Sequence, residues 1–154
     1  MAAQGLELDP MQRELLLSQL DFFLQAASDA ARQDYAALRE AVVAGCVAPP
    51  AMARLEAILE LCLSGERLRK TKGPAAYHAL NALFERTPRG QARAAELASL
   101  NQALAQLKGA PLVEIGATAR GPGAYALALG TENCRIVLRV EAGGIRVESL
   151  EVGA

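Results

Sequence analysis

The side chains best suited to bind a ligand are seven basic residues between positions 67 and 93. Residues 64–108 hold eight Lys or Arg against three acidic residues, while residues 1–63 hold nine acidic residues against four basic ones. The seven basic residues predicted to form one anion-binding patch are Arg67, Arg69, Lys70, Lys72, Arg86, Arg89 and Arg93. Clustered positive charge attracts anions, and the free N–H groups at a helix start add to that attraction. The pattern predicts a site for an anionic ligand or nucleic acid, unless these charges are solvated and pair with acids elsewhere in the chain.

Residues that could carry out catalysis are few and poorly placed. His78 is the only histidine, and Asn81 and Ala82 occupy the i+3 and i+4 positions where a carboxylate or cysteine could orient it. A small enzyme that uses His78 is therefore the least favoured function. The run Lys70-Thr71-Lys72-Gly73 lacks the earlier glycine and the preceding strand of a phosphate-binding loop. We predict no catalytic residue, no metal site and no cofactor.

The other reactive side chains have structural explanations. Cys46, Cys62 and Cys134 are too widely spaced for a zinc site and odd in number for a disulfide framework. We interpret them as small buried residues in a reducing cytoplasm. Glu56 and Glu60 share a helix face at i, i+4 spacing, and an exposed helix surface explains this pair without a function.

Length and composition favour one cytoplasmic domain. The chain has 154 residues, of which 52% are hydrophobic and 4% aromatic. The hydrophobic fraction suffices for a core, and the scarcity of aromatics argues against base stacking as the main chemistry. The sequence shows no secretory signal and no apolar run near the ~20 residues of a membrane span. We predict a loose segment at 1–9 and a single α+β domain at 10–152 without membrane association, in a composition typical of a GC-rich bacterium.

Residues 10–108 are predicted to form about five helices, each with recognisable boundaries. The helix starts, marked by a capping residue or a proline, are Asp9-Pro10, Ser28-Asp29, Pro49-Pro50, Pro74 and Thr87-Pro88. Glycines at 45, 65 and 109 end three of the helices. The polar stretch 66–73 is interpreted as a loop. The last helix carries a leucine seam, consisting of Leu97, Leu100, Leu104 and Leu107, which could face the sheet or a partner.

Residues 112–152 are predicted to form a four-stranded antiparallel meander that packs against the helices. Three groups of turn residues, at 119–123, 130–133 and 143–144, separate runs that alternate apolar and polar side chains with period 2. A loop at 143–144 places Glu141 opposite Arg146, and a loop at 130–133 places Leu127 opposite Ile136. One sheet face is then apolar and forms a core with the helices, which defines an α+β fold.

The opposite face of the predicted sheet carries a row of small residues. Ala124, Ala126 and Ala128 leave the second strand with little polar cover, and Val137 and Leu150 are assigned to the same face. A plain solvent face explains this row; alternatively, it is a flat contact surface for a second subunit. Together with the leucine seam, it leads us to expect a non-enzymatic interaction or assembly protein that forms a homodimer. The expected partners are a second copy or another protein, with nucleic acid or another polyanion as the alternative.

Overall fold

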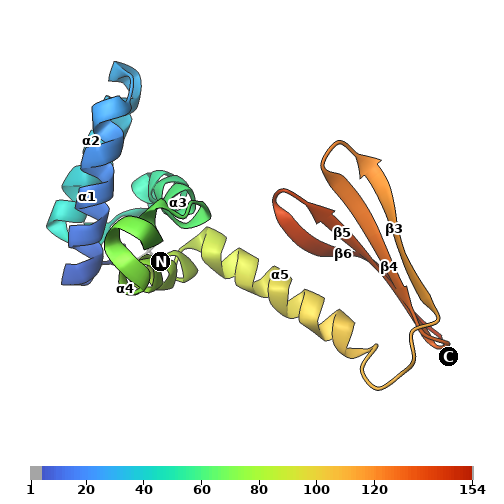
Figure 1. The fold of residues 1–154 in the computed structure, drawn as a ribbon. Coiled ribbons are helices and arrows are strands. Elements are labelled where there is room, and N and C mark those ends of the chain that lie inside the picture. Colours follow the sequence, from blue (N-terminus) through green and yellow to red (C-terminus); the bar gives the residue numbers. More distant parts are fainter. Residues whose placement is uncertain (1–4, 154) are drawn as a thin grey trace. The chain divides into compact units, whose positions relative to one another are not determined.

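The computed structural model describes residues 5–153, and its element order confirms the predicted α+β fold (Figure 1). Five helices precede a four-stranded antiparallel sheet. The helices are α1 (Pro10–Ala26), α2 (Asp29–Ala44), α3 (Pro49–Ser64), α4 (Arg67–Glu85) and α5 (Pro88–Ala105). The large sheet consists of β3 (Glu114–Gly121), β4 (Ala124–Gly130), β5 (Cys134–Glu141) and β6 (Gly144–Val152). Two short strands, β1 (Leu6–Glu7) and β2 (Cys46–Val47), pair with each other.

The chain divides into two compact units whose boundary falls inside α5, after Gln91. The first unit contains β1, β2, α1–α4 and the first turn of α5; the second contains the rest of α5 and the large sheet. Each unit has its own hydrophobic core. The prediction of one domain over residues 10–152 concerns how these units associate, so it stays a prediction.

Helix boundaries in the first unit follow the capping signals of the sequence. Asp9 and Gln12 form a reciprocal capping box at the start of α1, and the Ser28 hydroxyl accepts a hydrogen bond from the Ala31 amide at the start of α2. Gly45 ends α2 with a φ of 83°, a left-handed conformation that glycine adopts without strain. The fully buried side chains that pack between α1, α2, α3 and α4 include Leu16, Leu20, Leu38, Val42, Leu55, Leu59, Leu80 and Leu83.

Two segments of the first unit that we expected to be irregular are regular in the structure. Residues 6 and 7, within the stretch predicted to be loose, pair with Val47 and Cys46, while residues 1–4 of that stretch lie outside the described residues. Residues 67–72, interpreted as a loop, form the first part of α4. Gly73, with a φ of 86°, interrupts the helix, and Pro74 begins its second part where the sequence predicts a helix start.

The four strands of the large sheet lie in sequence order and are all antiparallel, as predicted, but their register differs. Leu127 lies opposite Leu138 instead of Ile136, and Glu141 lies opposite Gly144 instead of Arg146. Both differences are shifts by two residues, because each loop begins one residue away from its predicted position. A shift of two preserves the face on which a side chain lies, so the alternation of the sequence cannot reveal it.

A β-bulge in β6 changes the face of the residues that follow it. Leu138 pairs with Val147, but Val137 pairs with Ser149, so Glu148 is an additional residue on β6. After the bulge, Leu150 lies opposite Ile136, on the apolar face of the sheet. The prediction that Leu150 belongs to the alanine face is therefore wrong, because period-2 counting fails across an inserted residue.

The second unit's core consists of α5 packed on the apolar face of the sheet. Leu100 and Ala103 of α5 are buried against Cys134, Ile136 and Leu138 of β5. Two further leucines of the helix, Leu104 and Leu107, are partly buried in the same core. The leucine seam of α5 therefore serves mainly to hold the sheet, and of its members only Leu97 is largely exposed.

Candidate functional site

The basic residues predicted to form an anion-binding patch are mostly engaged by neighbouring groups. The guanidinium of Arg67 lies 3.3 Å from the ring centroid of Phe22, and that of Arg69 lies 3.9 Å from the ring centroid of Tyr77. Both are cation–π geometries. Lys70 forms an ion pair with Glu66 one helical turn earlier. These contacts leave less of the positive charge available to an external anion.

The other members of the predicted patch are distributed over both units. Arg86 donates a hydrogen bond to the backbone oxygen of Glu7 at 3.0 Å, and Arg89 pairs with two glutamates of α3. Lys72 lies on the first part of α4, whereas Arg93 belongs to the second unit. Six of the seven predicted residues therefore belong to the first unit, and five of these six contact other groups of that unit.

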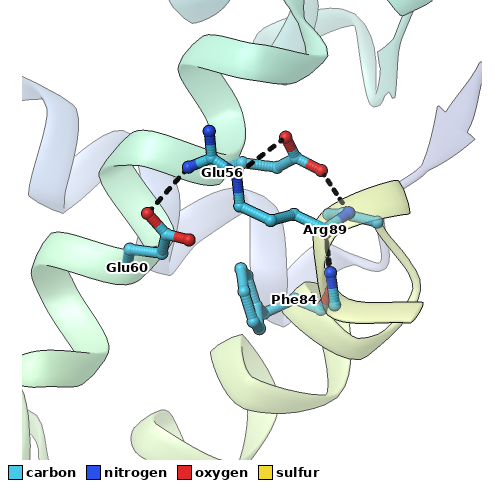
Figure 2. A network of polar contacts seen from close by, with 6 residues as sticks. Glu56, Glu60, Phe84 and Arg89 are labelled. Atoms are coloured by element: carbon cyan, nitrogen blue, oxygen red, sulfur yellow. Dashed lines mark hydrogen bonds and ion pairs between the residues drawn. The ribbon is translucent and has the colours of Figure 1, made fainter. Parts of the chain in front are cut away.

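Arg89 is the centre of a polar network that joins α3 to the start of α5 (Figure 2). Its backbone N–H donates to the Glu56 carboxylate at 2.7 Å, and its guanidinium donates to Glu60 at 2.8 Å. Glu56 is only 6% exposed, so the interpretation of both glutamates as exposed surface is wrong for this residue. A buried carboxylate is tolerated here because it caps the positive end of a helix and faces a guanidinium.

Close backbone packing fixes the same helix start. The buried Thr87 hydroxyl donates to the Phe84 carbonyl oxygen at 2.8 Å and accepts from the Gly90 amide at 3.1 Å. This confirms the predicted N-cap at Thr87. Gly90 lies against the Phe84 carbonyl so closely that a Cβ atom built on it would be 1.9 Å from that oxygen. Glu56, Thr87, Gly90 and Arg89 therefore have structural roles, and this network leaves no open space for a ligand.

The candidate catalytic and metal-binding residues do not assemble into a site. The His78 ring lies 6.1 Å from the Tyr77 ring in an edge-to-face contact. Among residues 5–153 no group of three His, Cys, Asp or Glu side chains could hold a metal ion. Cys62 and Cys134 are buried, whereas Cys46 is exposed, so the interpretation of all three as buried is wrong for Cys46.

Thiol reactivity follows from these environments and provides a prediction. Burial raises the pKa of Cys62 to about 11, and the nearby Arg67 charge only partly opposes this shift. Native protein treated with iodoacetamide at pH 8 should be modified at Cys46, and at all three cysteines only after denaturation.

Because the folded pKa of Cys62 lies above the ordinary 9.0, the stability from neutral Cys62 is fully present below pH 9 and declines towards pH 11. Peptide mass mapping and urea titrations between pH 8 and 11 measure both effects; rapid labelling of native Cys62 would contradict the assignment.

The alanine face of the sheet is a shallow trough with small residues at its base. Gly116, Thr118, Ala126 and Ala128 form the base, and the cavity above them has a volume of about 390 Å³. Ala126 and Val137 are 4% and 8% exposed although they lie on this face, because longer side chains surround them. The alanine row is therefore more enclosed than a plain solvent face, and its role as a contact surface for a second subunit stays a prediction.

Two ion pairs lie at the two ends of this trough. At one end, Arg135 of β5 donates two hydrogen bonds, of 2.9 and 3.1 Å, to Glu114 of β3 across the glycine at position 130 of β4. This pairing holds the pKa of the Glu114 carboxyl below its ordinary value. At the other end, Arg120 and Glu148 approach to 3.4 Å, although they belong to β3 and β6, the two edge strands.

The contact between the edge strands explains why β4 carries alanines. Three strand spacings would separate β3 and β6 by about 14 Å in a flat sheet. Arg120 and Glu148 can meet only because the sheet curls and both side chains reach over the middle strands. Small residues at 126 and 128 leave room for them. The row of alanines predicted on β4 is therefore present, and its small side chains accommodate the charged side chains of Arg120 and Glu148.

The apolar face of the sheet is wider than the helix that covers it. A helix is about 10 Å across, whereas four strands span about 14 Å between the axes of the edge strands. Five apolar side chains on this face are therefore between 43% and 68% exposed: Ile115, Tyr125, Ile145, Leu150 and Val152. The alternation of the sequence predicts which face is apolar but not how much of that face a helix covers, so the exposure of these five residues is not predicted from it.

The β3 strand forms an open edge of the sheet. Every residue of β3 is exposed, and among residues 5–153 its only neighbour in the sheet order is β4. An edge strand presents unpaired N–H and C=O groups that can pair with another strand. This open edge and the exposed apolar residues nearest to it, Ile115 and Tyr125, together form the candidate interaction site of the protein.

Comparisons with protein-family models, with curated proteins and with solved structures found no match to this chain. Among the residues that the structure describes, no helix is long and apolar enough to cross a membrane.

Proposed function

We propose that this protein is a non-enzymatic interaction or assembly protein that associates with itself through the second unit. The observation that supports this proposal best is the exposure of apolar side chains on the covered sheet face, at Ile115 and Tyr125 on the β3 side and at Ile145, Leu150 and Val152 on the β6 side. Single exposed apolar residues are common on monomers, but exposed apolar residues beside an open strand edge are typical of an interaction surface. Ile115 and Tyr125 lie on β3 and β4, next to the exposed β3 edge, so they support this function together with that edge.

The magnitudes indicate that apolar burial alone does not hold such an assembly together. Complete burial of a large apolar side chain contributes roughly 1.5–3 kcal/mol, so covering Ile115 and Tyr125, which are 68% and 51% exposed, contributes roughly 2–4 kcal/mol. Association costs on the order of 4–15 kcal/mol in lost freedom of motion. A stable dimer therefore needs directional interactions as well, and an open strand edge can supply them.

The oligomeric state of matched variants tests the proposal. Light scattering coupled to size exclusion should show a wild-type dimer whose dissociation constant rises about a hundredfold in Ile115→Asp/Tyr125→Asp, or about 2.7 kcal/mol, because charges would enter the apolar contact beside β3. Leu61→Asp is the control, since Leu61 is also more than half exposed but lies on α3 in the first unit. A wild-type protein that is monomeric at every concentration would contradict the proposed function.

The alternative function is binding of an anionic ligand or nucleic acid through residues 67–93. It depends on the positive charge of this segment, much of which is engaged by Phe22, Tyr77, Glu66 and the α3 glutamates. Self-association is favoured because its surface has no such partner among the described residues of its unit. A polyanion titration at several salt concentrations, with the Arg69→Ala/Lys70→Ala/Lys72→Ala variant as comparison, distinguishes the two functions.

A further inference from the structure

We infer that two copies of this chain join β3 to β3 as antiparallel neighbours, with Ala117 of one copy opposite Ala117 of the other. This inference rests on the proposed self-association and specifies its partner, strand and register. The result is one continuous eight-stranded sheet with a two-fold axis beside Ala117. In this register residue 114 lies opposite residue 120 of the second copy, and residue 115 lies opposite residue 119.

The composition of β3 makes a close approach of two strands possible. Its central residues are Gly116, Ala117 and Thr118, all small and all exposed. A Cβ atom built on Gly116 would meet no atom within 4 Å, so the space beside the strand is open. Natural edge strands often carry lysines, prolines or inward-pointing charges near their middle, and these residues prevent pairing with another strand. In β3 the charged residues, Glu114 and Arg120, lie towards the ends.

Charge complementarity selects the register. Glu114 and Arg120 are equally distant from Ala117 along the strand and have opposite signs. Both line the trough face of the sheet, because each is among the residues around the trough. Antiparallel pairing about Ala117 therefore places each Glu114 opposite the Arg120 of the second copy, and opposite charges at facing positions stabilise a strand pair.

The intrachain ion pairs extend this pattern without competing with it. Glu114 is already bound to Arg135, and Arg120 to Glu148, and all four side chains retain substantial exposure. Association about Ala117 aligns Arg135 and Glu114 of one copy with Arg120 and Glu148 of the other, in a row of alternating sign. The two-fold axis produces this row twice. A shift of two residues in register would instead place Glu114 opposite Thr118, without charge pairing.

The other edge of the sheet is less suited to self-pairing. The bulge at Glu148 lies in the middle of β6, where it interrupts the regular spacing of backbone groups. The irregularity of β3 lies at its end, at Arg120, so residues 114–119 keep the regular spacing of backbone groups and only the last facing pair includes an irregular position. Pairing through β3 also places exposed Ile115 opposite Ala119 of the second copy, whose partner on β4 is the exposed Tyr125.

A charge exchange tests the register with the full-length chain. Glu114→Arg alone and Arg120→Glu alone each place like charges opposite each other twice, so each variant should dissociate at least tenfold more readily than the wild type. An equimolar mixture of the two variants restores both opposite-charge pairs, and it should form heterodimers with near wild-type affinity. Arg135→Gln is the matched control, because it removes the intrachain partner of Glu114 but leaves the facing charges unchanged, and it should remain dimeric.

Disulfide trapping supplies a second, geometric readout. In a Cys46→Ser background, Ala117→Cys should give a covalent dimer on mild oxidation, because facing residues of antiparallel strands have Cα separations of 4.5–5.5 Å, within the range of disulfides. Ala119→Cys should not, since the two copies of residue 119 would lie about four residues apart along the strand pair.

The outcomes separate the register from the proposed function. If the wild type is a dimer but the charge variants neither dissociate nor complement each other, the register is wrong and the proposed function stands. A monomeric wild type would overturn both, and capture of a strand from a different protein at β3 would overturn the second copy as occupant.

Discussion

Replacing Gly90 by alanine should destabilise the first unit by about 3 kcal/mol, the upper part of the range for overpacking. The added Cβ atom would lie 1.9 Å from the Phe84 carbonyl oxygen and 2.6 Å from its carbon, and both are backbone atoms that cannot rotate away. Either the start of α5 shifts, which breaks the Thr87 hydrogen bonds, or the end of α4 shifts, which disturbs the Phe84 packing. Urea unfolding followed by circular dichroism measures the loss, as a lower midpoint at an unchanged slope.

The control for this substitution is Gly65→Ala in the same unit. Gly65 has ordinary extended backbone, and the nearest atoms to a Cβ built on it are 3.9 Å away. This variant should therefore change the free energy of unfolding by less than about 1 kcal/mol. Equal effects of the two substitutions would show that the close contact at Gly90 does not determine stability, and that only the conformational freedom of glycine matters.

The parts of the fold that depend on neighbouring residues in the chain could be predicted from the sequence. The cap at Thr87 and the break before Pro74 arise from local backbone chemistry, and both lie where the sequence places them. The face alternation of β4 and β5 was equally predictable. The register was not, because a slip of two residues keeps Leu127 on the same face. The bulge at Glu148 carries no glycine or other local signal, and so the side of Leu150 was missed.

The candidate site depends on distances that a single sequence does not contain. Ile115 is exposed because α5, the one helix packed on the sheet within the second unit, cannot cover four strands. The role of Glu56 depends on Arg89, which is 33 residues away along the chain. A signal did exist: Glu56 adjoins Leu55 on α3, where the helix turns its apolar side inward. The sequence also shows that β3 has opposite charges at equal distances from small central residues. This composition indicates pairing with another strand only because the structure places β3 at the edge of the sheet.

Replacing Glu56 by alanine should cost about 2–3 kcal/mol, the range for a hydrogen bond to a charged group together with lost packing. The variant removes the acceptor of the Arg89 N–H at the buried start of α5 and the inner ion pair of the guanidinium. Arg89 itself is about half exposed, so its charge is not left buried, and the larger penalties of fully buried pairs do not apply. The melting temperature of a unit of this size should fall by about 10 °C or more.

Two matched variants separate the cap from the ion pair. Glu60→Ala removes the exposed partner of the same guanidinium, and it should cost less than about 1 kcal/mol because solvent screens that pair. Glu56→Gln keeps an oxygen acceptor for the Arg89 N–H without the negative charge, so it should fall between the two alanine variants. Amide hydrogen exchange at Arg89 adds a local readout: protection should be lost in Glu56→Ala and retained in Glu60→Ala. If both alanine variants had equal effects on stability and exchange, the arginine side chain would hold α3 to α5, and the capping role of Glu56 would be wrong.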